Sequence, residues 1–212
     1  MLVTTSLRLL FPEGPDAPRA YEPPPWRPYF GVRLGGQHFL HERLGGGLEM
    51  RTEQASLGSA LDQYFQIAVG VDISRFLAAE LMADGYKGTL RLRGLGNLGK
   101  LSLYAVIPEV RLKYPLLDNR LVPYALAGIG VSYAESHDLK PPATNLDVSA
   151  ENFAPIGAVG LGVDYFLVRN IALGLESKYV IDRGHEVTVQ RQARHVNLDS
   201  IISSVGLRIY FR

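Results

Sequence analysis

A glycine-rich segment is the first candidate for chemistry in this chain. Residues 94–100, Gly-Leu-Gly-Asn-Leu-Gly-Lys, have the GxxxxGK spacing of a phosphate-binding loop, in which backbone N–H groups and the lysine hold phosphates. The next residue is Leu101, where a nucleotide-bound magnesium ion needs a Ser or Thr hydroxyl, and no helix is predicted to follow. We therefore interpret this segment as a flexible connection and not as a nucleotide site.

The histidines are a second candidate, because imidazole is the usual metal ligand and general base near neutral pH. All of them fall in or beside the long connections of the chain: His38, His41, His137, His185 and His195. Together with Ser136, they make a metal site or a hydrolase or acyltransferase centre the enzymatic alternative. No HExxH or other fixed-spacing pair is present, so the sequence predicts no catalytic residue, no metal ligand and no cofactor.

The third candidate is a set of charged residues that recur at alternate positions in otherwise apolar stretches. The set comprises Arg33, Glu80, Glu109, Arg111, Lys113, Asp164, Glu176, Lys178 and Arg208. Five basic and four acidic groups nearly balance, which suits mutual pairing inside a closed structure, where an unpaired ion costs several kcal/mol. We expect a network of ion pairs that fills an interior, and we favour this structural role over a gate or a proton path.

The elements that position these charges are segments of period two, the repeat of a strand whose two faces meet different surroundings. Eight segments alternate in this way: 29–40, 62–72, 76–90, 101–115, 121–136, 153–167, 170–182 and 196–211. Their connections are short at 73–75, 116–120 and 168–169, and long at 41–61, 91–100, 137–152 and 183–195. Because long and short connections alternate strictly, the sequence predicts an all-β, antiparallel, up-and-down barrel of eight strands.

The composition of the two faces predicts which of them is inside. The face that carries the charges also carries glycines, for example Gly160, Gly162 and Gly174, whereas the other face is aliphatic. A narrow barrel interior requires small residues, but a solvent-exposed face does not. We therefore expect the charges to point inward and the aliphatic residues to face lipid.

Aromatic residues on the aliphatic face are an independent indication of a membrane. Phe65, Tyr104, Tyr133 and Tyr179 fall near the end with the long connections, and Phe30, Tyr114, Tyr165 and Phe211 fall near the end with the short turns. Two aromatic girdles separated by an aliphatic band are typical of a protein that crosses both interfaces of a bilayer.

These features resemble a known family. The meander, the segment Pro-Tyr-Ala-Leu-Ala-Gly-Ile-Gly at 123–130 and the final Val-Gly-Leu-Arg-Ile-Tyr-Phe at 205–211 are similar to the small outer-membrane β-barrels of Gram-negative bacteria, the OmpA transmembrane-domain and OmpW-like group. The resemblance covers 29–211. It implies a non-enzymatic barrel in the outer membrane, in contact with outer-membrane lipid, that acts as an envelope scaffold or binds a partner. A narrow conduit for small or hydrophobic solutes and an enzyme at the rim are the alternatives.

Composition bounds the remaining possibilities. The chain has 212 residues, a net charge of +1 and no cysteine, so nucleic acid is not expected as a partner and a disulfide, a thiolate metal site and a cysteine nucleophile are excluded. The longest stretch without charge, 121–134, is too short for a membrane helix. Residues 1–7 lack the basic region of a secretory signal.

Residues 1–28 contain seven prolines and are predicted to be an extended or disordered segment that precedes the barrel at 29–212. The run Pro23-Pro-Pro-Trp26 is either a docking site for an envelope protein or a stiff lead-in to the first strand, and we favour the lead-in. The long loops are the other candidate site for a protein partner.

Three segments conflict locally with this scheme. Residues 74–85 have a helix-like composition with a Ser cap and a terminal Gly, but a strand is favoured there because the alternation of connections requires it. Pro108 lies mid-strand and lacks an N–H donor, so a β-bulge is predicted. Residues 53–61 are a candidate for a short helix in the first long loop.

Overall fold

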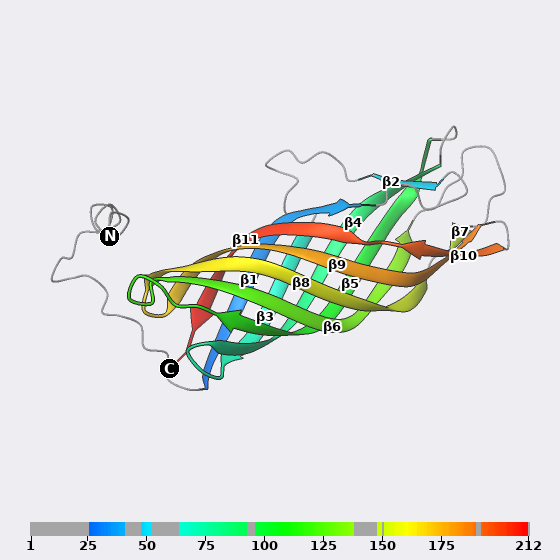
Figure 1. Cartoon of the computed structure of the whole chain (residues 1–212). Coiled ribbons are helices and arrows are strands. Elements are labelled where there is room, and N and C mark those ends of the chain that lie inside the picture. Colours follow the sequence, from blue (N-terminus) through cyan, green and yellow to red (C-terminus); the bar gives the residue numbers. More distant parts are fainter. Residues whose placement is uncertain are drawn as a thin grey trace.

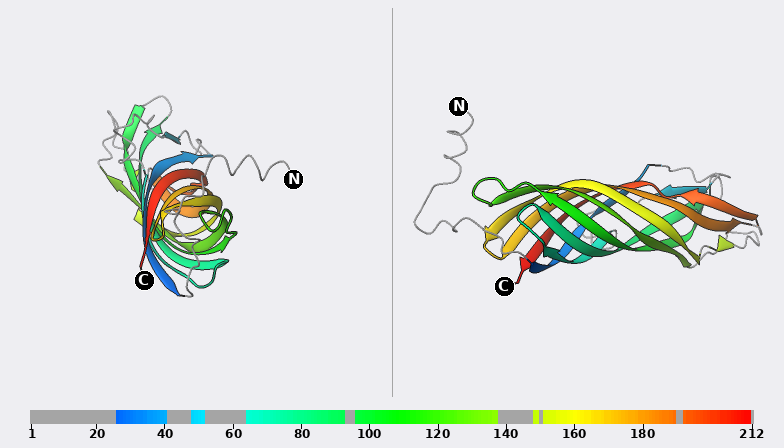
Figure 2. Two further views of the ribbon diagram at one scale, coloured as in Figure 1. Left: turned by 90° about the vertical axis from the view of Figure 1, so that its left-hand side faces the viewer. Right: turned by 60° about the horizontal axis from the view of Figure 1, so that its bottom comes forward.

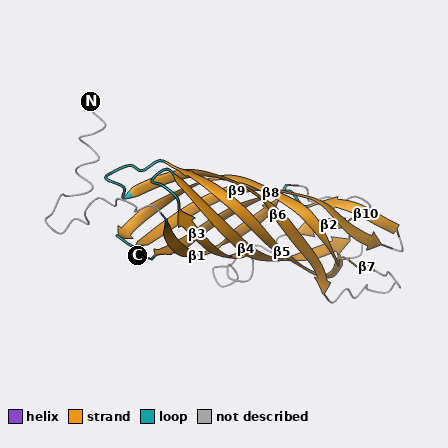
Figure 3. Cartoon of the chain, turned by 90° about the horizontal axis from the view of Figure 1, so that it is seen from below, coloured by secondary structure: helices purple, strands orange, loops and turns teal. Residues whose placement is uncertain are grey.

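A computed structural model describes residues 26–40, 48–51, 64–92, 96–137, 148–149, 151–189 and 192–211. Within these ranges the chain forms strands joined by turns, without a helix (Figure 3). The strands are β1 (Arg27–Phe39), β2 (Leu48–Arg51), β3 (Tyr64–Asp72), β4 (Leu77–Leu92), β5 (Gly96–Lys113), β6 (Leu121–His137), β7 (Val148–Ser149), β8 (Glu151–Val168), β9 (Ile171–Val189), β10 (Gln192–Asn197) and β11 (Ser200–Tyr210). The described residues contain no helix that is long and apolar enough to cross a membrane.

Eight of these strands close into a barrel in which each pairs antiparallel with its neighbours. The order around the ring is β1-β3-β4-β5-β6-β8-β9-β11, and β11 pairs back with β1. The ring of tilted strands is visible in Figure 1 and, from one end, in the left view of Figure 2. The short strands β2, β7 and β10 pair with extensions of β4 and β9. The prediction of an eight-stranded antiparallel barrel is therefore confirmed.

The alternation of connections sets the two ends of the barrel. The turns β3–β4, β5–β6 and β8–β9 lie at one end, where β1 also begins and β11 ends, since Tyr29 pairs with Tyr210. The long connections lie at the other end, and β4, β5 and β9 extend there beyond the predicted segments. Residues 96–100 belong to β5, and all of them except Leu98, at a register shift, pair with β4 or β6. The prediction of a flexible connection is thus wrong for them, because the ladder continues past the barrel.

The helix-like segment 74–85 shows that tertiary context overrides local propensity. Residues from Leu77 onward form β4, and Ala78 pairs with both Asp72 of β3 and Arg111 of β5. Ladders on both sides satisfy the backbone groups, which outweighs propensity differences of tenths of a kcal/mol per residue. Residues 1–25 of the predicted proline-rich segment and residues 53–61, the candidate for a short helix, lie outside the described residues.

The predicted bulge at Pro108 is wrong. Toward β4, Pro108 pairs with Leu81 in an unbroken register. Toward β6 no pair forms at Ile107 or Pro108, yet Val106 and Glu109 on either side share one register. The strand therefore accommodates the missing N–H by a gap in one ladder and not by an inserted residue.

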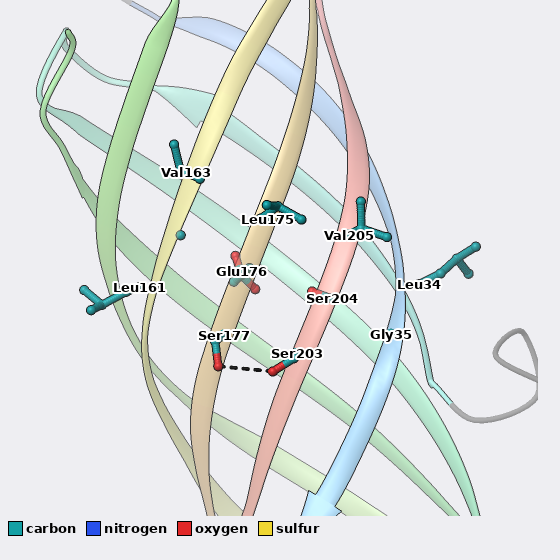
Figure 4. A pocket seen from close by; sticks show the side chains of 11 residues that line it. Leu34, Gly35, Leu161, Val163, Leu175, Glu176, Ser177, Ser203, Ser204 and Val205 are labelled. Carbon is teal, nitrogen blue, oxygen red and sulfur yellow. Dashed lines mark hydrogen bonds between the residues drawn. The ribbon is translucent and has the colours of Figure 1, made fainter. Parts of the chain in front are cut away.

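The two faces of the barrel wall have opposite chemistry. Leu161, Leu175 and Val205 are exposed on the outside, whereas Arg111 and Glu176 are 1% and 4% exposed inside. Figure 4 shows the aliphatic side chains pointing away from the barrel around a shallow outer groove of about 560 Å³, while Glu176 points to the interior. The groove lies on the outer wall and is not a lumen cavity. In its floor the hydroxyls of Ser177 and Ser203 lie 3.3 Å apart and satisfy each other.

Candidate functional site in the barrel lumen

Four buried side chains from four strands meet at the centre of the lumen. Arg33 comes from β1, Glu80 from β4, Arg111 from β5 and Glu176 from β9, and we call them the central ion cluster. Arg111 Nη2 lies 2.8 Å from Glu80 Oε1 and 2.9 Å from Glu176 Oε2. Arg33 bridges the same two carboxylates, at 3.5 Å and 3.2 Å. Each cation therefore contacts both anions, so the cluster ties opposite walls of the barrel together.

Tyrosine and a second ion pair extend this cluster. Tyr124 donates its hydroxyl proton to Glu176 over 2.9 Å, and its ring stacks on the Arg111 guanidinium, 4.5 Å from ring centroid to Cζ. Arg208 pairs with Asp164 and approaches Glu80 Oε2 at 3.8 Å. Arg208 and Asp164 thus join the central cluster through a shared carboxylate.

Lys178 forms a second group on the long-connection side of the cluster. Its Nζ lies 3.6 Å from Glu109, 3.9 Å from Asp84 and 2.6 Å from the sulfur of Met82. We call eight of these residues the charged layer, which has four positive and four negative groups: Arg33, Glu80, Glu109, Arg111, Asp164, Glu176, Lys178 and Arg208. Asp84 is a further negative group that contacts this layer through Lys178. Every ion of the layer approaches an opposite charge.

Lys113 lies outside the charged layer. It sits nearer the short turns and pairs with Asp72 at 2.6 Å. The structure therefore brings eight of the nine predicted charged residues together and places the ninth on a separate pair. Asp72 and Asp84 were not among the predicted charged residues, although both have the inward parity of their strands, Asp72 with Gln66 and Asp84 with Glu80.

Glycines make the room that these long side chains need. A Cβ on Gly160 would lie 2.7 Å from Lys178 Cβ, one on Gly128 2.7 Å from Glu109 Cγ, and one on Gly174 2.7 Å from an oxygen of Asp164. A Cβ on Gly206 would overlap Arg33, and one on Gly162 would overlap the Tyr124 ring. The interior of an eight-stranded barrel is just wide enough to be filled by side chains, so these empty positions determine where the charged residues fit.

Apolar side chains close the lumen on both sides of the charged layer. Toward the long connections lie Tyr64, Met82, Ala105, Ile107, Ile156, Ala158, Val180 and Ile202. Toward the short turns lie Tyr29, Ala78, Val122, Phe166, Ala172 and Tyr210. The sequence pattern predicted an interior filled by ion pairs, and it did not indicate these apolar layers. The lumen is thus filled by an apolar, a charged and a second apolar layer.

A buried polar group lies beyond the apolar layer on the long-connection side. Ser132 Oγ is 3.0 Å from His185 Nε2 and 2.9 Å from Asp182 Oδ1. His185 Nε2 also contacts Asp182 at 3.0 Å. A hydrolytic triad needs one imidazole nitrogen for the serine and the other for the carboxylate, so this arrangement lacks the geometry of an activated nucleophile. The described residues contain no group of three metal-ligating side chains that could hold an ion.

The predicted girdle residues all lie on the outer face. Phe65, Tyr104, Tyr133 and Tyr179 are at one end, and Phe30, Tyr114, Tyr165 and Phe211 are at the other. On neighbouring strands, Tyr104 of β5 pairs with Tyr133 of β6, and Tyr133 pairs with Phe153 of β8. The ring centroids of Tyr133 and Phe153 lie 4.9 Å apart. Phe153, Phe76 and Trp26 are further exposed outer aromatics that the sequence analysis did not include.

A barrel with aliphatic residues outside and paired ions inside is the architecture of an outer-membrane protein. The family model of the OmpA-like transmembrane domain matches residues 27–212, which span the whole barrel. The chain belongs to this family. As a member of the OmpA-like transmembrane domain family, it is a β-barrel of the bacterial outer membrane, embedded in lipid, and the resemblance inferred from the sequence is confirmed.

Solved structures share this fold at low sequence identity. OprG from Pseudomonas aeruginosa has a TM-score of 0.60 and 11% identity, with 91% of this chain and 99% of OprG covered. Neisserial surface protein A has a TM-score of 0.55 and 15% identity, with 88% and 97% covered. AlkL, solved in lipid bilayers, has a TM-score of 0.51 and 17% identity, with 94% and 96% covered. No sequence among the curated proteins is significantly similar to this chain.

Proposed function

We propose that this protein is a non-enzymatic outer-membrane barrel with a sealed lumen, which acts as an envelope scaffold or binds a partner at its ends. The observation that carries the proposal is the filling of the lumen. The central ion cluster links four strands, and an apolar layer lies on each side of it. A solute would have to separate buried ion pairs and displace packed aromatic rings to pass. The free-energy cost of uncompensated buried charge makes this route unfavourable.

The same ion pairs connect strands of the barrel across the lumen. Three of the four contacts of Arg111 and Arg33 join strands that are not neighbours in the ring, namely β5 with β9, β1 with β4 and β1 with β9. The fourth, from Arg111 to Glu80, joins the neighbouring strands β5 and β4. Cross-lumen links of this kind resist flattening of the barrel. The eight outer aromatic residues act, in this proposal, as girdles that hold the barrel at the depth of the two headgroup regions.

Conductance measurements test the sealed lumen. Purified protein, folded as judged by a gel band that shifts on heating, is expected to give no steady single-channel steps in planar bilayers, because ion pairs and apolar side chains occupy the lumen. Steady, evenly sized steps that change in size or disappear in Arg111→Ala would contradict the proposal. That result would favour the alternative of a narrow conduit lined by the charged residues.

The match to the OmpA-like transmembrane domain family, together with the likeness to the outer-membrane proteins OprG and AlkL, supports a barrel without enzymatic activity. In this proposal a partner binds through the long connections or the proline-rich segment, because binding residues are often carried on the segments that connect strands. The rim-enzyme alternative gains no support from the geometry of Ser132 and His185.

A further inference from the structure

The short-turn end of the barrel carries one arginine on each of its three turns. Arg75 follows β3, Arg120 follows β5 and Arg169 follows β8. These turns are distributed around the ring, since β3, β5 and β8 are separated by intervening strands. We call the three residues the arginine rim. The charged layer, the girdles and the proposed function do not use them.

The guanidinium groups of the arginine rim are available for a ligand. Arg75 and Arg169 are exposed and Arg120 is partly exposed. Among the described residues, no carboxylate pairs with any of the three. Asp72 at this end is already paired with Lys113, which leaves Asp118 as the other described acid. The described charged residues of this end are Arg27, Arg75, Lys113, Arg120 and Arg169 against Asp72 and Asp118, so five minus two gives a charge of +3.

Exposed apolar side chains accompany each rim arginine. Phe76 lies next to Arg75 and is 50% exposed, with the guanidinium carbon 4.8 Å from its ring centroid. Leu116 and Leu117 precede Arg120, and Leu167 and Val168 precede Arg169, and all four are exposed. An arginine placed just past a lipid-facing apolar group extends its charge to the headgroup level while its stem stays in contact with apolar surface.

We propose that the arginine rim binds lipid headgroups of net negative charge, such as phosphatidylglycerol, in the leaflet at the short-turn end. Guanidinium binds phosphate oxygens bidentately, and a basic segment at a membrane surface attracts anionic lipid. The arrangement favours lipid over an acidic protein, because lipid surrounds the barrel as the three arginines do, whereas one protein partner would meet a single side. The inference requires the membrane embedding but not the sealed lumen.

The chain contains a reporter for this binding. Trp26 is the single tryptophan, it is 68% exposed, and its backbone N–H donates to the backbone carbonyl of Asp72 at the short-turn end. The protein is reconstituted in phosphatidylcholine bilayers that contain a small fraction of a brominated lipid. This lipid is either phosphatidylglycerol or phosphatidylcholine, and in both cases its acyl chains carry bromine near the headgroup. Brominated phosphatidylglycerol is expected to quench Trp26 fluorescence about fivefold more strongly per lipid than brominated phosphatidylcholine. High salt should remove the difference, because ions screen exposed charges.

Two triple variants locate the effect. Arg75→Gln with Arg120→Gln and Arg169→Gln should make the two brominated lipids equal quenchers. The control, Arg51→Gln with Lys87→Gln and Arg91→Gln, removes the same charge from strands β2 and β4 near the other end and should keep the preference. Equal quenching in the unaltered protein would overturn the proposal, as would loss of the preference in the control. Quenching by brominated phosphatidylcholine and a heat-shifted gel band show that each variant is inserted and folded.

Discussion

Replacing Arg111 by methionine is expected to lower the free energy of unfolding by about 3–5 kcal/mol. Arg111 is buried and contacts both Glu80 and Glu176 within 2.9 Å, so its removal leaves two carboxylates with only Arg33 between them. Breaking a buried ion pair costs more than the pair contributes, because the remaining charge stays desolvated. Denaturant titration of the protein in lipid vesicles measures the loss.

Two further variants separate charge balance from lost packing. Arg111→Met combined with Glu176→Gln restores neutrality and should recover most of the stability, since Arg33 and Glu80 can still pair. Arg169→Met changes an exposed arginine in the same way and should alter stability by less than about 0.5 kcal/mol. If Arg111→Met costs no more than Arg169→Met, the central ion cluster does not hold the barrel together.

An arginine introduced on the outer wall should lower the free energy of unfolding by more, the deeper it lies in the bilayer. Val159 is exposed midway along β8 between Phe153 and Tyr165, so Val159→Arg places a charge near the centre of the aliphatic band. We expect a loss of about 2–4 kcal/mol in unfolding free energy. Leu167→Arg, on the same face of the same strand but beside the short turn, should cost only about 0–1 kcal/mol.

Denaturant titration in lipid vesicles measures the loss of unfolding free energy in Val159→Arg and in Leu167→Arg. The difference between the two losses tests the depth assigned to Val159. Equal costs at the two positions would show that Val159 does not lie deeper in lipid than Leu167. The depth assigned to the girdles would then be incorrect, even with the barrel fold intact.

The strands could be predicted from the sequence because the two environments of the wall differ strongly. Period two located all eight barrel strands to within a few residues at the short-turn end, where tight turns limit them. At the other end the ladder of β4 and β5 continues to Leu92 and Gly96, past the barrel, where no bilayer enforces an alternation. The missing signal explains why 91–100 was interpreted as a loop and why β2, β7 and β10 were not predicted.

The interior was predicted only in part, because a face can be inward and still be apolar. Tyr29, Tyr64 and Tyr124 share the inward parity with the charged residues, but an aromatic residue has no parity preference of its own. In β6 the outward Ala125 and Ala127 are smaller than the inward Tyr124 and Leu126, so hydrophobicity does not distinguish the faces. The pairing of Arg111 with Glu176 likewise joins residues of distant strands, and spacing along the chain carries no information on it.

Spin labels on β6 test the inverted barrel most directly. The chain has no cysteine, so single-cysteine variants at Ala125, Ala127 and Ile129, all exposed on the outer face, can be labelled with a nitroxide without background. In bilayers we expect frequent collisions of these labels with oxygen, which concentrates in lipid, and few with a water-soluble nickel complex. Collisions with the nickel complex as frequent as in the unfolded chain would mean that the aliphatic face meets water, which would contradict the membrane barrel and the proposals that depend on it.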